Sequence, residues 1–236
     1  MSEFDNILPW GGMKRVILNV DGTVAYELDP GDSNKKADGS AVDWDEVESL
    51  GQNCMVQIPK FWFTKKADGD IVTFGVSDRP KDDWVVHPAF YRQRDRLCDI
   101  QSEDPVPEVE YRYIGAFHGW QDSEGRLRSL PHKSPVTDIT MGNSRNAAKK
   151  MGNGYGIWDY YLLYAIQMLY ITEYGHPDSQ TQIGRGYVDG NSAKTNTGAT
   201  LEYGNNTFGE ATGKVQMSYR GIEDFWGNVY NWIDGV

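Results

Sequence analysis

The sequence is poor in the residues from which metal centres and nucleophilic active sites are built. It contains two cysteines, Cys54 and Cys98, and neither belongs to a CxxC pair, which excludes a cysteine-based zinc cluster. None of its four histidines lies at an HxH or HExxH spacing. It also lacks the GxSxG, GxxxxGKS/T and GxGxxG patterns of serine hydrolases and phosphate-binding loops. We therefore expect no catalytic residue and no metal-ligand set.

Basic residues and long apolar runs are scarce as well. Lys and Arg total 23 against 34 Asp and Glu, and the formal net charge is -11. A groove that follows phosphates needs cations, so nucleic acid and anionic membranes are not expected as partners. No stretch is long and apolar enough for a membrane helix or a secretory signal, so we expect synthesis in a cytosol. Ca²⁺ stays the one open cofactor, because carboxylates are its usual ligands. A disulfide between the two cysteines is also open, although separate thiols are the preferred interpretation.

The chain is rich in aromatic residues, glycine and acidic residues. Aromatics make up 13% of the 236 residues, which argues for a folded chain, and 26 glycines indicate many turns. The length suits one large domain. Among the acidic pairs of the sequence, we expect Asp82/Asp83, Glu108/Glu110 and Glu223/Asp224 each to be a pair of solvated charges.

The first half of the sequence has the pattern of β structure. Asp21-Gly22 between two β-branched runs, 16–20 and 23–26, is a strong hairpin signal. A polar loop is expected over 29–40 and a short helix over 43–50. One strand is expected over Met55–Thr64, with Pro59 placing it at an edge or a bulge. Further strands are expected over 71–76, 84–87 and 110–116.

The second half is predicted to hold two helices, a long loop and a final strand. A short helix is expected over 143–151, with Asn143 or Ser144 as its N-cap. The segment Trp158–Tyr174 is apolar nearly all round and ends at Gly175, which predicts the central helix. Residues 176–215 have no periodicity and read as a long loop. A last strand is expected over 229–233, with Trp226 and Trp232 buried against the central helix.

Three of these segments together resemble the formylglycine-generating-enzyme-like branch of the C-type lectin fold. They are Pro135–Asp138 with the helix after it, Gly156–Gly175, and Gly227–Ile233, which is similar to the GNVWEW strand of that family. Blocks such as Met55–Phe63 (MVQIPKFWF) and His87–Phe90 resemble phage and prophage structural proteins that carry this domain. The resemblance spans residues 10–236 and implies an α+β fold. Two helices would pack on a small, twisted, mostly antiparallel sheet with long loops.

Under this resemblance, residues 1–52 form a β-rich N-terminal segment and residues 53–236 the C-type-lectin-like domain. The enzymatic members use two reactive cysteines in the C-terminal half. Both cysteines here precede Pro135, so the oxidase chemistry does not carry over. Such domains also continue past the final strand, so we expect a truncated C-terminal end or a partner chain that completes the sheet.

The resemblance implies a phage virion protein, made in the host cytoplasm and associated with the tail or a fibre, that binds a host-surface receptor or glycan. Other virion proteins are expected partners, and a homo-oligomer, first a trimer, is the expected assembly. The alternative is a purely structural component such as a head fibre, decoration or tail adaptor protein, and an enzyme of the same fold ranks below both. The binding face is expected in the loops of residues 176–215, where stacking rings and amides are available. The candidate ligand-binding residues are Tyr187, Asp189, Asn191, Tyr203, Asn205, Asn206 and Phe208.

Overall fold

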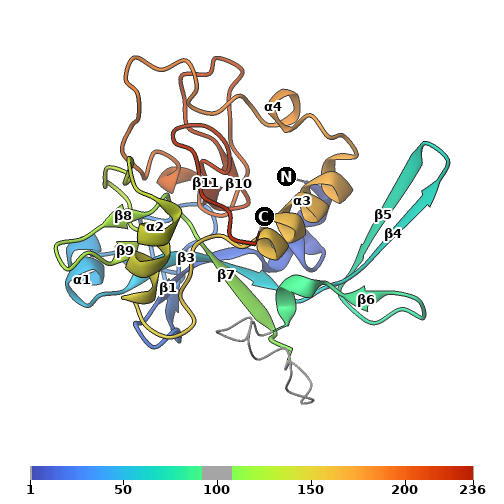
Figure 1. Cartoon of the computed structure of the whole chain (residues 1–236), viewed down its shortest axis with the longest axis horizontal. Coiled ribbons are helices and arrows are strands. Elements are labelled where there is room, and N and C mark those ends of the chain that lie inside the picture. The colour runs from blue at the N-terminus through green and yellow to red at the C-terminus, as the bar shows by residue number, and fades with distance from the viewer. Residues whose placement is uncertain (1, 92–107, 236) are drawn as a thin grey trace.

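The computed structural model describes residues 2–91 and 108–235 and shows an α+β architecture (Figure 1). The α-helices are α1 Trp44–Ser49, α2 Met141–Lys149, α3 Tyr160–Tyr174 and α4 Ser179–Gln182. The strands are β1 Lys14–Leu18, β2 Val24–Glu27, β3 Asn53–Pro59, β4 Trp62–Asp68, β5 Ile71–Ser77, β6 Val85–Val86, β7 Tyr111–Gly115, β8 Trp120–Gln121, β9 Leu127–Arg128, β10 Ser218–Tyr219 and β11 Ile222–Glu223. All sheets are small and antiparallel, which confirms the expected α+β class.

The central sheet has the strand order β2-β1-β3-β7 and carries much of the core. The hairpin of β1 and β2 closes through Asp21-Gly22, as its sequence predicts, because Gly22 takes the positive φ that such turns need. Ile17, Cys54 and Ile114 are buried in this sheet. Because β1 pairs with β3, the predicted boundary between residues 52 and 53 falls between two strands of one sheet; the division itself stays a prediction.

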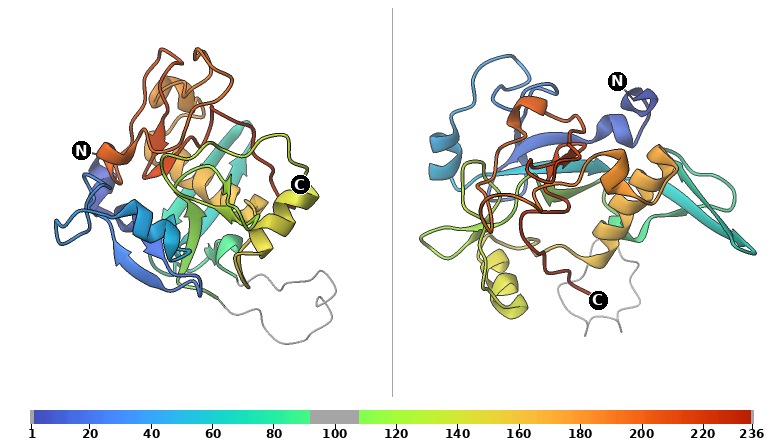
Figure 2. Two further views of the ribbon diagram at one scale, coloured as in Figure 1. Left: turned by 90° about the vertical axis from the view of Figure 1, so that its left-hand side faces the viewer. Right: turned by 90° about the horizontal axis from the view of Figure 1, so that it is seen from above.

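The single strand expected over Met55–Thr64 is wrong, because the chain forms two strands there. β3 ends at Pro59, which lacks an N–H, and the Lys60 N–H donates instead to Glu110 O. β4 then belongs to a second sheet of order β5-β4-β6. The β4–β5 hairpin extends away from the body of the molecule, and Ile71 near its tip is 69% exposed (Figures 1 and 2).

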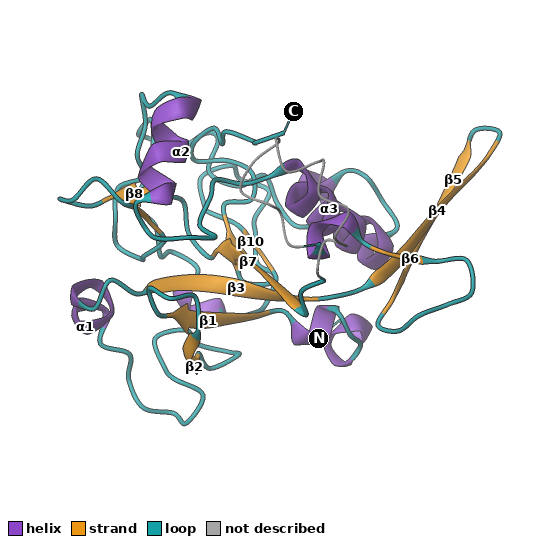
Figure 3. Ribbon diagram, turned by 60° about the horizontal axis from the view of Figure 1, so that its bottom comes forward, coloured by secondary structure: helices purple, strands orange, loops and turns teal. Residues whose placement is uncertain are grey.

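The two longest helices lie on one side of the central sheet (Figure 3). α2 begins at Met141 with Thr140 as its cap, so the predicted cap at Asn143 or Ser144 is wrong; the Asn143 N–H donates to Thr140 Oγ1. α3 begins two residues later than expected, because Asp159 caps it by accepting the Leu162 N–H at 2.8 Å. It ends at Gly175 in the left-handed conformation, as predicted.

The C-terminal region departs most from expectation. The strand predicted over 229–233 is wrong, since these residues form no strand, and the last strands are β10 and β11. Gly227 and Asn228 both have positive φ and form a turn before residues 229–233, which make no backbone hydrogen bond with the other described residues. Trp226 is half-buried, whereas Trp232 is 49% exposed, so its predicted burial against α3 is also wrong. Residues 176–215 are mainly loop, as predicted, with α4 as a short interruption.

Candidate functional site

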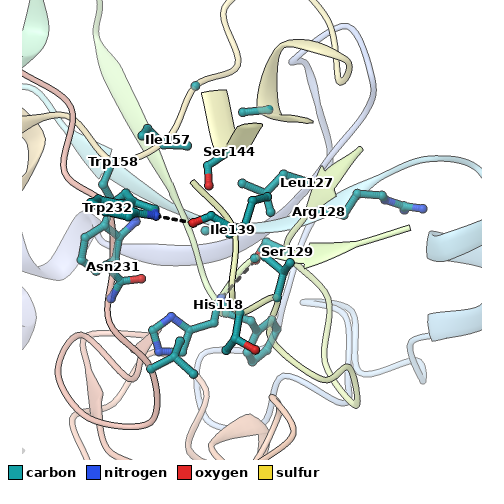
Figure 4. A pocket seen from close by; sticks show the side chains of 18 of the residues that line it. His118, Leu127, Arg128, Ser129, Ile139, Ser144, Ile157, Trp158, Asn231 and Trp232 are labelled. Atoms are coloured by element: carbon teal, nitrogen blue, oxygen red, sulfur yellow. Dashed lines mark hydrogen bonds between the residues drawn. The ribbon is translucent and has the colours of Figure 1, made fainter. Parts of the chain in front are cut away.

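A cavity of about 720 Å³ lies between α2, the ends of β3 and β7, and the C-terminal segment (Figure 4). Its walls come from parts of the chain that are far apart in the sequence, and α2 contributes Met141, Ser144 and Ala148. Cavities of this size that are lined mainly by apolar side chains are typical ligand sites in proteins. The apolar lining includes Met55, Leu127, Val136, Ile139, Ile157 and Trp158.

Residues 229–233, which we call the strap, pass along the rim of the cavity, and residues 229–232 line it. Trp232 holds the strap across the cavity, because its Nε1–H donates to Ile139 O at 2.8 Å (Figure 4). Tyr230 is fully exposed, at 105% of the reference area, and contributes to the lining of the cavity mouth. An exposed tyrosine next to a half-exposed tryptophan offers flat apolar faces together with hydrogen-bonding groups.

The floor of the cavity contains the buried imidazole of His118. This residue is 6% exposed, and its Nε2 atom has no hydrogen-bond partner within the described residues. Burial lowers the pKa of His118 to about 4, so the ring is neutral at physiological pH. A neutral imidazole can accept or donate one hydrogen bond at the free nitrogen, depending on its tautomer. His118 is therefore a polar group available to a molecule that enters the cavity.

A buried carboxylate, Glu223, also reaches the cavity wall, but its oxygens are occupied. Oε1 accepts the Gly198 N–H at 2.7 Å, and Oε2 accepts the N–H and the hydroxyl of Thr200 at 2.8 and 2.7 Å. The Thr200 hydroxyl in turn accepts from Arg15 Nη2 at 2.8 Å. Burial raises the pKa of Glu223, and the charge of Arg15 opposes this shift. Glu223 thus belongs to a satisfied internal network.

Asp224, the next residue, is fully buried behind the cavity wall. Its Oδ2 accepts from Gln216 Nε2 at 2.6 Å and from Asn228 Nδ2 at 2.9 Å, and lies 4.0 Å from His118 Nε2. Its Oδ1 has no partner within the described residues. Burial, and then the charge of Glu223, raise the pKa of Asp224 to about 7. This carboxyl group therefore holds its proton over much of the range in which an ordinary aspartate is ionised.

The solvated state predicted for the three acidic pairs is wrong for one of them. Asp82/Asp83 and Glu108/Glu110 are exposed, as expected. Glu223 and Asp224 are 2% and 0% exposed, and donors from elsewhere in the chain bind three of their four carboxylate oxygens. Their immediate neighbours, Ile222 before them and Phe225-Trp226 after them, are the one sequence signal that separates this pair from the others.

The seven predicted ligand-binding residues fall into two groups, and none of them lines the cavity. In the first group, the Tyr187 hydroxyl bonds to Ser192 Oγ at 2.9 Å, and Asp189 forms an ion pair with Arg185. Asn191 in the same loop is exposed. These three residues form a small polar surface in which Tyr187 and Asp189 stabilise their own loop.

The second group packs against the N-terminal segment. Tyr203 and Phe208 stack with ring centroids 3.8 Å apart. Asn205 Oδ1 accepts the Arg15 N–H at 2.8 Å, and Asn206 Nδ2 donates to Tyr203 O at 2.9 Å. Each contact holds the loop in place, although the binding role of these residues stays a prediction. Sequence reasoning missed His118, Tyr230 and Asn231, which line the cavity.

Within residues 2–91 and 108–235, no three His, Cys, Asp or Glu side chains are grouped so as to hold a metal ion. Cys54 is fully buried, and burial raises the pKa of its thiol to about 12. Cys98, the other half of the disulfide left open by the sequence, lies outside the described residues. No helix in the described part of the chain is long and apolar enough to cross a membrane.

Comparison with known proteins adds no relative to this picture. No family model, no curated protein and no solved structure matches the chain.

Proposed function

We propose that this chain is a phage virion protein, associated with the tail or a fibre, whose C-type-lectin-like domain binds a host-surface glycan or protein receptor. The cavity with its aromatic rim carries the proposal, because it combines a mostly apolar lining with a few polar groups in positions fixed by burial. The assignment to a virion and to the lectin-like fold is supported by the resemblance of the segments ending in Gly227–Ile233. The small antiparallel sheets with two longer helices are compatible with that fold.

Binding is favoured over catalysis by the state of the acidic groups. Both oxygens of Glu223 already accept hydrogen bonds from the protein, and Asp224 lies behind the wall rather than on it. A general acid or base must come within hydrogen-bonding reach of the reacting group. Two cavity-lining residues, His118 and Arg128, each have a buried side-chain nitrogen without a hydrogen-bond partner within the described residues, and such polar atoms can orient a ligand. We therefore propose that the cavity binds a ligand and does not catalyse a reaction.

Binding of fluorescently labelled protein to host cells and to arrayed bacterial surface glycans tests this function. Ser144→Trp places an indole inside the cavity from α2, and Asn191→Trp adds the same bulk to the exposed loop. Loss of binding with the first change and retention with the second supports the cavity. The reverse pattern supports the loop residues predicted from the sequence. If the unsubstituted protein binds neither cells nor glycans, the receptor-binding function is wrong.

One observation favours the alternative, a purely structural virion component. The β4–β5 hairpin projects from the body with Ile71 and Val72 exposed, at 69% and 44%. Beyond Phe63 the hairpin no longer pairs with β6 and has two strands only. An isolated two-stranded ribbon is marginally stable in water, so a neighbouring subunit that covers this part would stabilise it. Electron microscopy of the intact particle decides between the two functions. A location away from the tail and fibre tips, with the hairpin buried in a neighbour, supports the structural role.

A further inference from the structure

The strap carries backbone groups that pair with no other described residue. No N–H or C=O group of residues 229–233 takes part in a backbone hydrogen bond within the described residues. Val, Tyr, Trp and Ile nevertheless all favour strands. Unpaired backbone of strand-forming sequence at a surface is a site at which another strand can add.

Fixed contacts hold both ends of the strap. The Asn228 N–H donates to Tyr187 O at 2.8 Å, and the Asp234 N–H donates to Trp158 O at 2.6 Å. The Asp234 carboxylate is also bound by two nitrogens of Arg145, at 2.6 and 3.0 Å. Because both ends are held, an added strand would not have to order a free terminus, which lowers the entropic cost of pairing.

The sequence of the strap indicates what that added strand is. Residues 227–235 read Gly-Asn-Val-Tyr-Asn-Trp-Ile-Asp-Gly, and in the reverse direction each position holds the same residue or one of similar type. Around Asn231, tyrosine is matched with tryptophan, valine with isoleucine, asparagine with aspartate, and glycine with glycine. In an antiparallel pair of identical strands related by a two-fold axis through Asn231, each residue would face its match. Aromatic and β-branched cross-strand pairs of this kind stabilise antiparallel strands.

Charge also favours a second copy at this position. The chain as a whole carries a net charge of -11, so like-charge repulsion opposes contact between most parts of two copies. Residues 229–233 contain no charged side chain, and the adjacent Asp234 is paired with Arg145. The strap is therefore an uncharged, self-complementary segment on an acidic protein.

We infer that two copies of this chain dimerise by antiparallel pairing of residues 229–233 about a two-fold axis at Asn231. The interface is isologous, since each copy presents the same segment to the other. Tyr230 of each copy then lies beside Trp232 of the other, and the two cavities open at the same interface. The expected assembly from the sequence is a trimer, and the dimer is our proposal in its place. Because Tyr230 and Trp232 also line the cavity, the interface lies at the cavity rim.

Sedimentation velocity of the full chain over a wide concentration range tests the dimer. The unsubstituted chain is expected to shift from monomer to dimer as its concentration rises, and Tyr230→Asp is expected to abolish that shift. Tyr230 is fully exposed, so this substitution leaves the monomer folded, which circular dichroism checks. Ile71→Asp, at the tip of the β4–β5 hairpin, is the matched control and should leave the dimer intact. A monomer at every concentration, or a dimer abolished by Ile71→Asp and not by Tyr230→Asp, overturns the inference.

Cysteine crosslinking tests the register. Asn231 faces its own copy across the axis, whereas Tyr230 faces Trp232, so Asn231→Cys should give a disulfide-linked dimer under mild oxidation and Tyr230→Cys should not. The unsubstituted chain, which carries Cys54 and Cys98, gives the background. Equal crosslinking of the two variants, or none in either, overturns the proposed pairing. Because neither measurement uses a ligand, failure here leaves the receptor-binding function untouched, and failure of receptor binding leaves the dimer untouched.

Discussion

Two pairs of neighbouring acidic residues in this chain, Asp82-Asp83 and Glu223-Asp224, lie in opposite environments. Asp82 and Asp83 lie next to the β4–β5–β6 sheet, exposed to water, and Asp83 pairs with Lys66 at 2.7 Å while both side chains stay more than half exposed. Glu223 and Asp224 lie in the interior, where five protein groups donate hydrogen bonds to them. The pairs are alike in composition, and the difference lies entirely in what the fold places around them.

The two pairs differ in what stabilises their polar groups, which is water in the first case and the protein in the second. At the exposed pair, water solvates the charges, and the ion pair contributes little to stability. At the buried pair, the charge of Glu223 must be balanced inside the protein, so the fold requires Arg15 and the Thr200 hydroxyl next to it. The buried network stands directly behind the cavity wall, and it fixes the position of Glu223 there.

The largest expected effect comes from removing the buried cation. Arg15 is 0% exposed and donates to Gly221 O, Ser33 Oγ and both oxygens of Thr200. Arg15→Met leaves the negative charge near Glu223 unbalanced, and we expect the free energy of unfolding to fall by about 3–5 kcal/mol. Urea denaturation followed by tryptophan fluorescence measures the change.

Arg79→Met is the matched control in the exposed region. Arg79 is 79% exposed and lies 3.4 Å from Asp78, so its removal should leave the urea midpoint unchanged. If Arg15→Met changes the urea midpoint as little as Arg79→Met does, the buried region does not depend on its cation for stability.

The stability of the protein should depend on pH through the buried carboxyl group of Asp224. The folded chain keeps the proton of Asp224 up to about pH 7, whereas the unfolded chain loses it near the ordinary pKa of 3.8. Between these values the folded state binds more protons, so this group makes the protein less stable as pH rises. Asp224→Asn lacks this titration. Relative to the variant, the unsubstituted protein should therefore lose stability from about pH 4 to about pH 7 and stay level above that.

Urea titrations of both proteins across this pH range measure the difference. The lowered pKa of His118 produces a slope of opposite sign, and it cancels because both proteins carry that residue. A difference in unfolding free energy that stays constant with pH would show that Asp224 is ionised in the folded state like an exposed aspartate.

The sequence predicts local features well because their determinants are adjacent in the chain. Asp21-Gly22 specifies the first hairpin, and Gly175 ends α3. The cavity and the buried network could not be predicted in this way. Glu223 is satisfied by residues near position 200, and its counter-charge comes from position 15, so only the assembled fold brings them together. The strand predicted over 229–233 is absent for a related reason. Strand propensity alone does not form a strand, because a neighbouring strand must also be present to pair with it.

A smaller effect is expected at the cavity rim. Trp232→Phe keeps an aromatic ring but removes the Nε1–H that donates to Ile139 O. Loss of this hydrogen bond should cost about 1 kcal/mol in unfolding free energy. Thermal and urea denaturation measure it. Trp226→Phe, which loses a similar bond to Gly184 O at 2.9 Å, is the control outside the cavity. An unchanged stability for Trp232→Phe would mean that the strap is not held by this contact.

The smallest expected effect returns to the exposed pair. A hydrogen bond from Lys66, and then its charge, lower the pKa of Asp83, so this group adds stability above the ordinary pKa and loses it as pH falls. The sign is opposite to that of Asp224. Because both side chains are solvated, the difference between the unsubstituted protein and Asp83→Asn should be barely measurable at low salt and absent at high salt. The Asp224→Asn difference should persist at high salt, because the protein interior excludes the screening ions. Urea titrations at two ionic strengths separate the cases, and equal salt sensitivity in the two variants would mean that solvent reaches Asp224.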